Sequence, residues 1–206
     1  MILPFWTQDD EMIARSVEDG APRLKLSVPE RLMVVVGRHG RPEVDVELER
    51  CLAEEVPVVR RPSGGGTVVL GPGQVVVSIS LPVPTRGRLE HHLANIGRWL
   101  STPLSSVAGV AVGVSGFSDL TVEDRKISGS GMLWRRGVLY YSAVILVNAD
   151  LSVIDRLLRH PAKEPDYRAG RSHLAFVQNL AAWNPALTAS AVVSQLQREL
   201  SLSQLL

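Results

Sequence analysis

Two short stretches of this sequence combine positive charge with a bare backbone, as a site for anions would. The first, "RRPSGGGTVVLGPGQ" (residues 60–74), sets two arginines and three consecutive glycines within strand-like sequence. Glycine weakens a strand, because it has no side chain to pack and loses the most entropy on ordering. The run does not match GxxxxGK[ST], so it does not indicate a P-loop. It indicates either backbone N–H groups that face an anion, with Arg61 as charge partner, or a glycine-rich bulge between exposed arginines.

The second stretch is "DLTVEDRKISGSGM" (residues 119–132), in which Lys126 precedes a Ser-Gly-Ser-Gly sequence. Lysine brings a compact positive charge to a phosphate or carboxylate, and glycines beside it would leave the backbone open. The alternative is a surface hairpin with an ordinary solvated lysine. Taken alone, this stretch favours the hairpin.

The composition limits the class of protein. The chain has 206 residues, 45% of them hydrophobic, with 22 basic and 21 acidic residues and a net charge of +1. This predicts one soluble domain that has no general attraction for nucleic acid or membrane. Cys51 is the single cysteine, which excludes an internal disulfide and a cysteine-rich zinc site. Because the start lacks a signal peptide and no apolar run reaches the roughly 20 residues that span a bilayer, we expect a cytoplasmic protein.

The elements that must position the two stretches alternate between clusters of strands and helices. Helices are expected over 9–20 (ended by Gly20), the second half of 43–56, 88–104, parts of the segment from 152 onward, and 188–201. Strands are expected over 30–39, 56–61, 67–83 (two strands around a turn at 71–73) and 109–151, a meander with turns at 116, 123–124 and 136–137. This pattern predicts an α+β fold, with a largely antiparallel or mixed sheet flanked by helices. We expect one catalytic domain over 1–206, with a core over 1–185 and a C-terminal helix over 186–206.

Together, "RRPSGGGTVV", "SDL", "DRKISGSG" and "ILVNADL" resemble the lipoate–protein ligase family, which shares its fold with octanoyltransferases and biotin–protein ligases. The resemblance spans roughly residues 31–180. It implies an enzyme that activates lipoate or octanoate with ATP and Mg²⁺ to an acyl-adenylate. The acyl group then passes to a lysine of a small acidic lipoyl-acceptor domain.

The resemblance also assigns residues. Lys126 would be the catalytic cation that contacts the acyl carboxylate and the α-phosphate, and Asp119 would lie near the metal and the phosphates. A fixed lysine between two anions stabilises their joining more than the separated ground state. The residues expected along the nucleotide and the acyl group are Arg61, Ser63, Gly64, Gly65, Gly66, Thr67, Val68, Val69, Ser128 and Gly129.

The sequence departs from the family pattern in four places. Leu70-Gly71 stand where ligases usually have His-Asp, and Tyr141-Ser142 stand where many carry a His pair. No cysteine follows Cys51, so the acyl-enzyme of octanoyltransferases is impossible at its family position. The segment after residue 180 is too short for the usual C-terminal accessory domain, which is then absent or a separate chain. Adenylate chemistry is favoured, with ATP-independent transfer from a carrier or binding without turnover as alternatives.

Three further features have ordinary explanations beside functional ones. The polar stretch 163–180 is either an adenylate-covering or acceptor-docking loop, with Arg168, Arg171 and His173 as candidates, or a connection held by ion pairs. Residues 91–92 are adjacent histidines of a predicted helix and do not share a face, so they do not form a metal pair. Leu48, Cys51 and Leu52 are expected on one apolar face, with Cys51 as a small buried hydrophobe.

Overall fold

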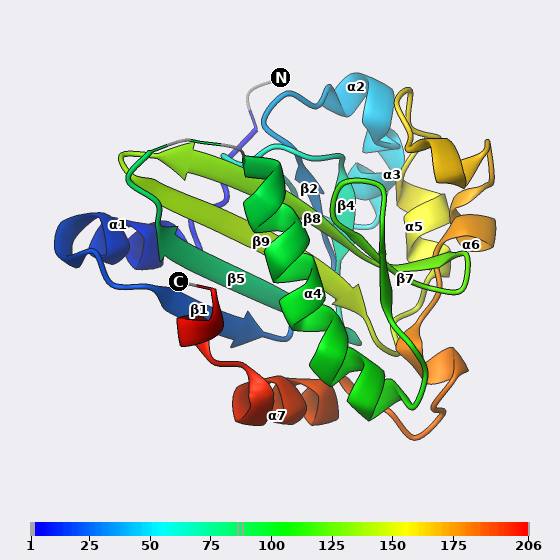
Figure 1. Cartoon of the computed structure of the whole chain (residues 1–206). Coiled ribbons are helices and arrows are strands. Elements are labelled where there is room, and N and C mark those ends of the chain that lie inside the picture. The colour runs from blue at the N-terminus through cyan, green and yellow to red at the C-terminus, as the bar shows by residue number, and fades with distance from the viewer. Residues whose placement is uncertain (1–2, 86, 88, 206) are drawn as a thin grey trace.

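Two β-sheets flanked by helices organise the chain in a computed structural model, which describes residues 3–85, 87 and 89–205 (Figure 1). Six strands form the larger sheet in the order β1-β5-β9-β8-β7-β6, and three form the smaller sheet in the order β3-β2-β4. The strands are β1 (Arg23–Ser27), β2 (Met33–Val36), β3 (Val58–Arg60), β4 (Val68–Leu70), β5 (Gln74–Pro82), β6 (Gly113–Ser115), β7 (Asp119–Val122), β8 (Arg125–Arg135) and β9 (Val138–Leu146). The helices are α1 (Asp10–Asp19), α2 (Pro42–Asp45), α3 (Leu48–Ala53), α4 (Leu89–Ala108), α5 (Ser152–Leu157), α6 (His173–Phe176) and α7 (Ala189–Glu199).

Short turns make the second half of the larger sheet an antiparallel meander from β6 to β9. The β7–β8 turn places Glu123 at φ 54°, and the β8–β9 turn places Arg136 at φ 51° and Gly137 at φ 75°. Such left-handed residues match the twist of the flanking strands in tight hairpins. The β7–β8 hairpin is the element that carries the lysine motif.

The smaller sheet positions the glycine-rich stretch. Strand β2 pairs in parallel with β3 and antiparallel with β4, so β3 and β4 lie on opposite sides of β2. Residues 61–67, which we call the glycine loop, therefore cross the carboxyl end of β2 on the way from β3 to β4. Backbone bonds fix the start of this crossing, where the N–H of Arg61 donates to Val36 O at 2.9 Å.

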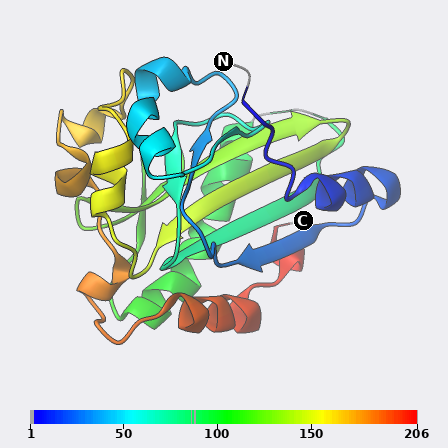
Figure 2. The ribbon, with the colours of Figure 1, turned by 180° about the vertical axis from the view of Figure 1, so that it is seen from behind.

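The main hydrophobic core lies between the larger sheet and the helices α4 and α7, which cover one of its faces (Figure 1). Apolar residues of α4 recur at helical spacing, and Ile96, Leu100 and Leu104 are fully buried against strand residues such as Ile79. The opposite face of the sheet meets α1 and the smaller sheet (Figure 2). None of the helices in the described part of the chain has both the length and the apolar character that crossing a bilayer requires.

A second core joins the smaller sheet to α3, α5 and α6. Val34, Cys51, Leu157 and Phe176 are buried there. This core fixes α6 beside the β7–β8 hairpin, since the N–H of Gln178 donates to Lys126 O at 2.9 Å. The connection between α5 and α6 is thereby held near the lysine.

The predicted α+β class, the Gly20 helix end and the strand turns are confirmed. Two details differ. Strand β1 was not predicted, although it pairs with β5 along its whole length. The predicted face of Leu48, Cys51 and Leu52 is wrong for Leu52, which is 80% exposed. Helix α3 has six residues and packs through Cys51 and Leu48, which leaves Leu52 beyond the contact.

Candidate active site

Lys126 forms an ion pair in a partly enclosed position and is not an ordinary surface lysine. Its Nζ lies 2.9 Å from Asp119 Oδ1, and the two side chains are 24% and 16% exposed. Both residues belong to the β7–β8 hairpin, where a register shift after Leu120 interrupts the regular pairing. The structure thus brings together two residues that the resemblance placed in the site.

The absence of a side chain at Gly129 leaves room for Lys126. A Cβ at Gly129 would lie 2.9 Å from Lys126 Cε and 3.0 Å from Nζ, so a side chain there would push the end of the lysine out of its present position. The lysine therefore lies directly along the glycine backbone. Ser128, the other predicted residue of this motif, is buried, and its hydroxyl has no hydrogen-bond partner among the described residues.

Arg61 uses most of its donors to fold the glycine loop. Its Nε and Nη2 donate to Gly64 O at 3.2 and 3.0 Å, and Nη2 also donates to Gly66 O at 2.6 Å. Nη1 donates to Val35 O at 3.3 Å. Burial lowers the pKa of this guanidinium to about 10, so it remains charged at neutral pH. Arg61 shapes the loop and adds positive charge beside it.

The three loop glycines differ in backbone conformation and in the space available for a side chain. Gly65 has φ 95°, a conformation that favours glycine, and its Cβ would lie 2.8 Å from Arg61 Nη2. Gly64 and Gly66 lack a positive φ. A Cβ at Gly64 would lie 3.9 Å from Met132 O, and a Cβ at Gly66 would meet nothing within 4 Å. The described fold therefore explains why position 65 is glycine. It does not explain why positions 64 and 66 are glycine, which a bound ligand would.

Two glycines outside the loop allow the loop backbone to pack directly against neighbouring segments of the chain. A Cβ at Gly37 would lie 2.1 Å from Gly65 O, and a Cβ at Gly131 would lie 2.4 Å from Gly64 O. The sequence placed Gly131 in the open Ser-Gly-Ser-Gly stretch and gave no sign of a special role for Gly37. Their role depends on contacts between distant segments.

The other predicted site residues of the glycine loop and of strand β4 mostly face inward. Ser63 is fully buried, and its hydroxyl has no partner within the described chain. Thr67 Oγ1 donates to Asp45 Oδ2 at 2.9 Å, which ties the loop to α2. Val69 packs in the second core, and Val68 is half-buried. If these residues meet a ligand, Val69 can do so only through its backbone.

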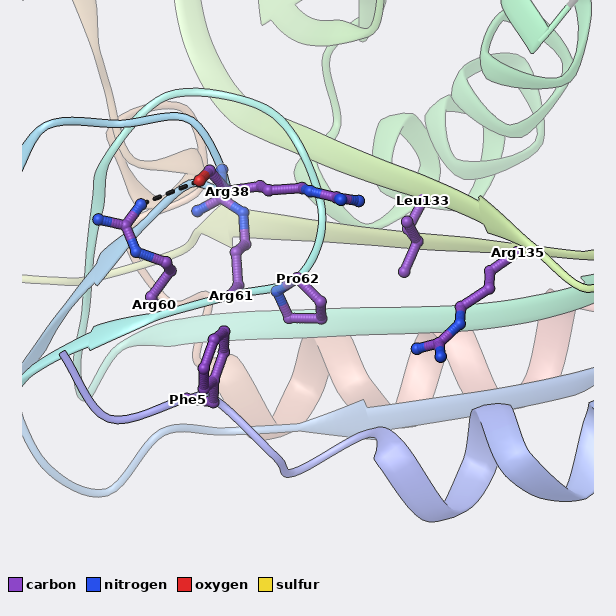
Figure 3. A pocket seen from close by; sticks show the side chains of 7 residues that line it. All are labelled: Phe5, Arg38, Arg60, Arg61, Pro62, Leu133 and Arg135. Atoms are coloured by element: carbon purple, nitrogen blue, oxygen red, sulfur yellow. Dashed lines mark hydrogen bonds between the residues drawn. The ribbon is translucent and has the colours of Figure 1, made fainter. Parts of the chain in front are cut away.

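A cationic cavity of about 500 Å³ opens beside the base of the glycine loop (Figure 3). It is lined by Phe5, Arg38, Arg60, Arg61, Pro62, Leu133 and Arg135. Arg60 Nη1 donates to the carbonyls of Gly37, Arg38 and Gly40 at 2.9 to 3.0 Å, so it holds the turn after β2. Within the described residues, Arg38 and Arg135 form no ion pair, and none of the lining side chains is acidic. The surroundings of the loop are therefore attractive to anions.

The polar connection between α5 and α6 is held by ion pairs and also reaches the lysine hairpin. Arg171 pairs with Asp124 at 2.7 Å, and Arg168, which is buried, pairs with Glu164 at 3.2 Å. His173 lies 3.1 Å from Arg159 O, and burial lowers the pKa of its imidazole. These contacts support the ion-pair interpretation. Sequence reasoning missed Tyr167, whose hydroxyl donates to Asp119 Oδ2 at 2.7 Å.

No metal site forms among the acidic residues in the described part of the chain. Over residues 3–85, 87 and 89–205, no three His, Cys, Asp or Glu side chains gather around a common point. Both oxygens of Asp119 already have partners, Lys126 and Tyr167. This arrangement does not fit a Mg²⁺ ligand.

The chain matches the model of the lipoyl protein ligase A/B catalytic domain over residues 5–201. It belongs to this family. Within it, the chain is 29% identical over 131 residues to lipoate-protein ligase A of Psychrobacter cryohalolentis, covering 63% of this chain and 37% of that protein. It is 28% identical over 167 residues to human mitochondrial lipoyl amidotransferase LIPT1, covering 81% of this chain and 44% of that protein. The chain thus spans less than half the length of these two relatives.

Solved structures of the family share the fold. One is a bipartite lipoate protein ligase, described with its E2 lipoyl domain, from Thermoplasma acidophilum. It matches with a TM-score of 0.80 at 22% identity, covering 95% of this chain and 76% of that one. A lipoate-protein ligase A bound with ATP also matches with a TM-score of 0.80, at 18% identity, covering 96% of this chain and 77% of that one. The predicted family and its catalytic-domain fold are confirmed.

Proposed function

We propose that this chain activates lipoate or a related medium-chain acid with ATP and transfers the acyl group to a lysine of an acceptor domain. In the first step, a carboxylate oxygen of the acid attacks the α-phosphorus of ATP, and pyrophosphate leaves. In the second, the acceptor amine attacks the acyl carbon, AMP leaves with the electrons of the broken C–O bond, and the amine proton passes to solvent.

The Lys126–Asp119 pair beside the bare backbone of Gly129 is the observation that carries this proposal. In the first step, two anions must approach each other, and negative charge accumulates at phosphorus. A lysine held at that point by Asp119, beside the bare backbone of Gly129, would stabilise the transition state without having to be ordered during the reaction. Its pairing with a carboxylate at 2.9 Å also supports the ability of this position to bind a substrate carboxylate.

The glycine loop would supply backbone donors to the adenylate. A Cβ at Gly66 would meet nothing within 4 Å, so its backbone is open, whereas the N–H of Gly64 already donates to Met132 O at 3.1 Å. Arg61 adds positive charge to the loop, and its guanidinium donates to the carbonyls of Gly64 and Gly66. A bare backbone can approach phosphate oxygens closely, which side chains would prevent. The likeness to the ATP-bound ligase fold supports ATP as the second substrate.

An acidic acceptor domain fits the charge of the surface beside the loop. Arg38 and Arg135 are exposed and form no ion pair in the described part of the chain, and they flank the cavity of Figure 3. The structural neighbour described with an E2 lipoyl domain supports a lipoyl domain as the acceptor. Since that neighbour is bipartite, a separate accessory chain is also part of the proposal.

Transfer from a carrier without ATP is the second candidate. It is favoured by the relative named as an amidotransferase, of which the match covers 81% of this chain. Cys51 would not take part, because it is buried in the second core and burial raises the pKa of its thiol. The acyl group would then pass directly from the carrier to the acceptor lysine.

Calorimetric titration separates the two candidates. The proposed ligase binds lipoate and ATP and releases pyrophosphate when both are present. A transferase binds an octanoyl or lipoyl carrier and transfers the acyl group with no nucleotide. Acyl transfer from the carrier, together with no heat on adding ATP, would overturn the ligase proposal.

A further inference from the structure

Tyr167 reaches the Lys126–Asp119 pair from a distant part of the chain. It lies in the short 3-10 helix Asp166–Arg168 between α5 and α6. Its hydroxyl donates to Asp119 Oδ2 at 2.7 Å, while Lys126 Nζ lies 2.9 Å from Oδ1 of the same carboxylate. Asp119 therefore holds the lysine with one oxygen and the α5–α6 connection with the other.

Packing on several sides aims the tyrosine hydroxyl at this carboxylate. The Tyr167 ring contacts the Phe176 ring with centroids 5.2 Å apart. A Cβ at Gly116 would lie 3.5 Å from the tyrosine ring, so the β6–β7 turn closes over it. Arg171 donates to Tyr167 O at 2.8 Å and to Asp124 Oδ2 at 2.7 Å, next to the lysine motif.

The hydroxyl acts as a donor at every physiological pH. Burial, together with the hydrogen bond to Asp119, raises the pKa of Tyr167 far above its ordinary value. A protonated phenol beside a carboxylate can only donate to it, and such charge-assisted bonds are stronger than neutral ones.

We propose that Tyr167 is a positioning residue for acid activation, and that it acts on Lys126 through Asp119. This role rests on the proposed function. The substrate carboxylate and the α-phosphate attract Lys126, so the ion pair between Lys126 and Asp119 must weaken when they bind. Tyr167 keeps a donor on Asp119 during that exchange, so the lysine can turn to the substrate at lower cost.

Removing the hydroxyl should therefore weaken the binding of anions specifically. In Tyr167→Phe, Asp119 loses its second donor and holds Lys126 more tightly. Calorimetry should show about tenfold weaker binding of lipoate, the loss expected for one hydrogen bond to a charged group. Lipoamide, which has no carboxylate, should bind with unchanged affinity. A purely structural role for Tyr167 would weaken both ligands equally.

A double-mutant cycle shows whether Asp119 carries the effect. In Asp119→Asn, the carboxylate that Tyr167 serves is neutral, so adding Tyr167→Phe should change lipoate affinity by less than about twofold. Glu164→Gln is the matched control in the same connection, because it removes the ion pair to Arg168 at 3.2 Å without touching Asp119. It should leave the ratio of lipoate to lipoamide affinity unchanged.

Equal losses for lipoate and lipoamide in Tyr167→Phe, or full additivity in the cycle, would overturn the role of Tyr167. A wild-type chain that binds neither lipoate nor ATP would instead overturn the proposed function and this role with it. In that case, a double-mutant cycle of Tyr167→Phe and Asp119→Asn on the free energy of unfolding would show whether their hydrogen bond only stabilises the fold. The two failures are thus distinguishable.

Discussion

Gly66 is the position where a ligand site and a purely structural loop lead to different expectations. A Cβ at Gly66 would meet nothing within 4 Å, and its φ lies outside the left-handed region. Alanine should therefore fit the folded state and restrict the unfolded chain. We expect the free energy of unfolding of Gly66→Ala to be unchanged or higher by up to about 1 kcal/mol.

Binding should respond in the opposite direction. The new methyl would occupy space that the adenylate needs and would hold a phosphate oxygen off a backbone donor. Loss of one hydrogen bond to a charged group costs about 1.5–3 kcal/mol, or roughly 10- to 150-fold in affinity. The paired assay is the thermal midpoint together with calorimetric affinity for a non-hydrolysable acyl-adenylate.

Two comparisons make the result interpretable. Gly113→Ala in β6 is the control, since its Cβ would make an ordinary contact at 3.8 Å with Thr121 Oγ1; it should change stability as little as Gly66→Ala does and leave adenylate affinity unchanged. Gly65 is a poor test position, because φ 95° and the 2.8 Å approach to Arg61 Nη2 would make folding and binding fall together. Equal adenylate affinity in Gly66→Ala and the wild type would refute the ligand explanation of the glycine loop.

Four further outcomes are expected. Lys126→Ala should lower pyrophosphate release about 10²- to 10³-fold while the chain stays folded, and full activity would remove Lys126 from the mechanism. Arg61→Lys should destabilise the chain by about 2 kcal/mol in urea denaturation, because several loop carbonyls lose their donor; equal stability would show that the loop folds without it. Cys51→Ser should retain activity, and mass spectrometry that finds an acyl group on Cys51 during turnover would revive a thioester mechanism. Burial lowers the pKa of His173 below 6.5, so the neutral imidazole contributes fully to stability above that pH, and this contribution is lost as the pH falls through the pKa of the folded state. His173→Gln should therefore flatten the acid side of the curve of unfolding free energy against pH. An unchanged slope would contradict this.

Local chemistry allowed much of the fold to be predicted. The turns at Gly116 and 136–137 contain glycines that adopt positive φ, whereas Glu123 and Arg136 are held at positive φ by their tight hairpins. Helix α4 follows from its apolar spacing. Strand β1 was missed although Leu24 and Leu26 alternate with polar residues, as in a half-buried strand. It is only five residues long, and its pairing with β5 makes it part of the larger sheet.

The site was predictable only where its residues are neighbours in sequence. Lys126 and Gly129 are three residues apart, and their contact follows from one short motif. Tyr167 and Asp119 are 48 residues apart, and nothing near the tyrosine in the sequence signals the carboxylate. The contacts of Arg61 with backbone carbonyls were likewise hidden, because residue types suggest a ligand contact just as readily.

The most direct test of the account is to look for the acyl-adenylate itself. The chain is mixed with lipoate and ATP, quenched after a single turnover, and examined by mass spectrometry. We predict lipoyl-AMP in an amount close to that of the enzyme, and almost none with Lys126→Ala. Absence of lipoyl-AMP from the wild-type chain, while the acyl group moves from a carrier to an acceptor lysine without ATP, would contradict it.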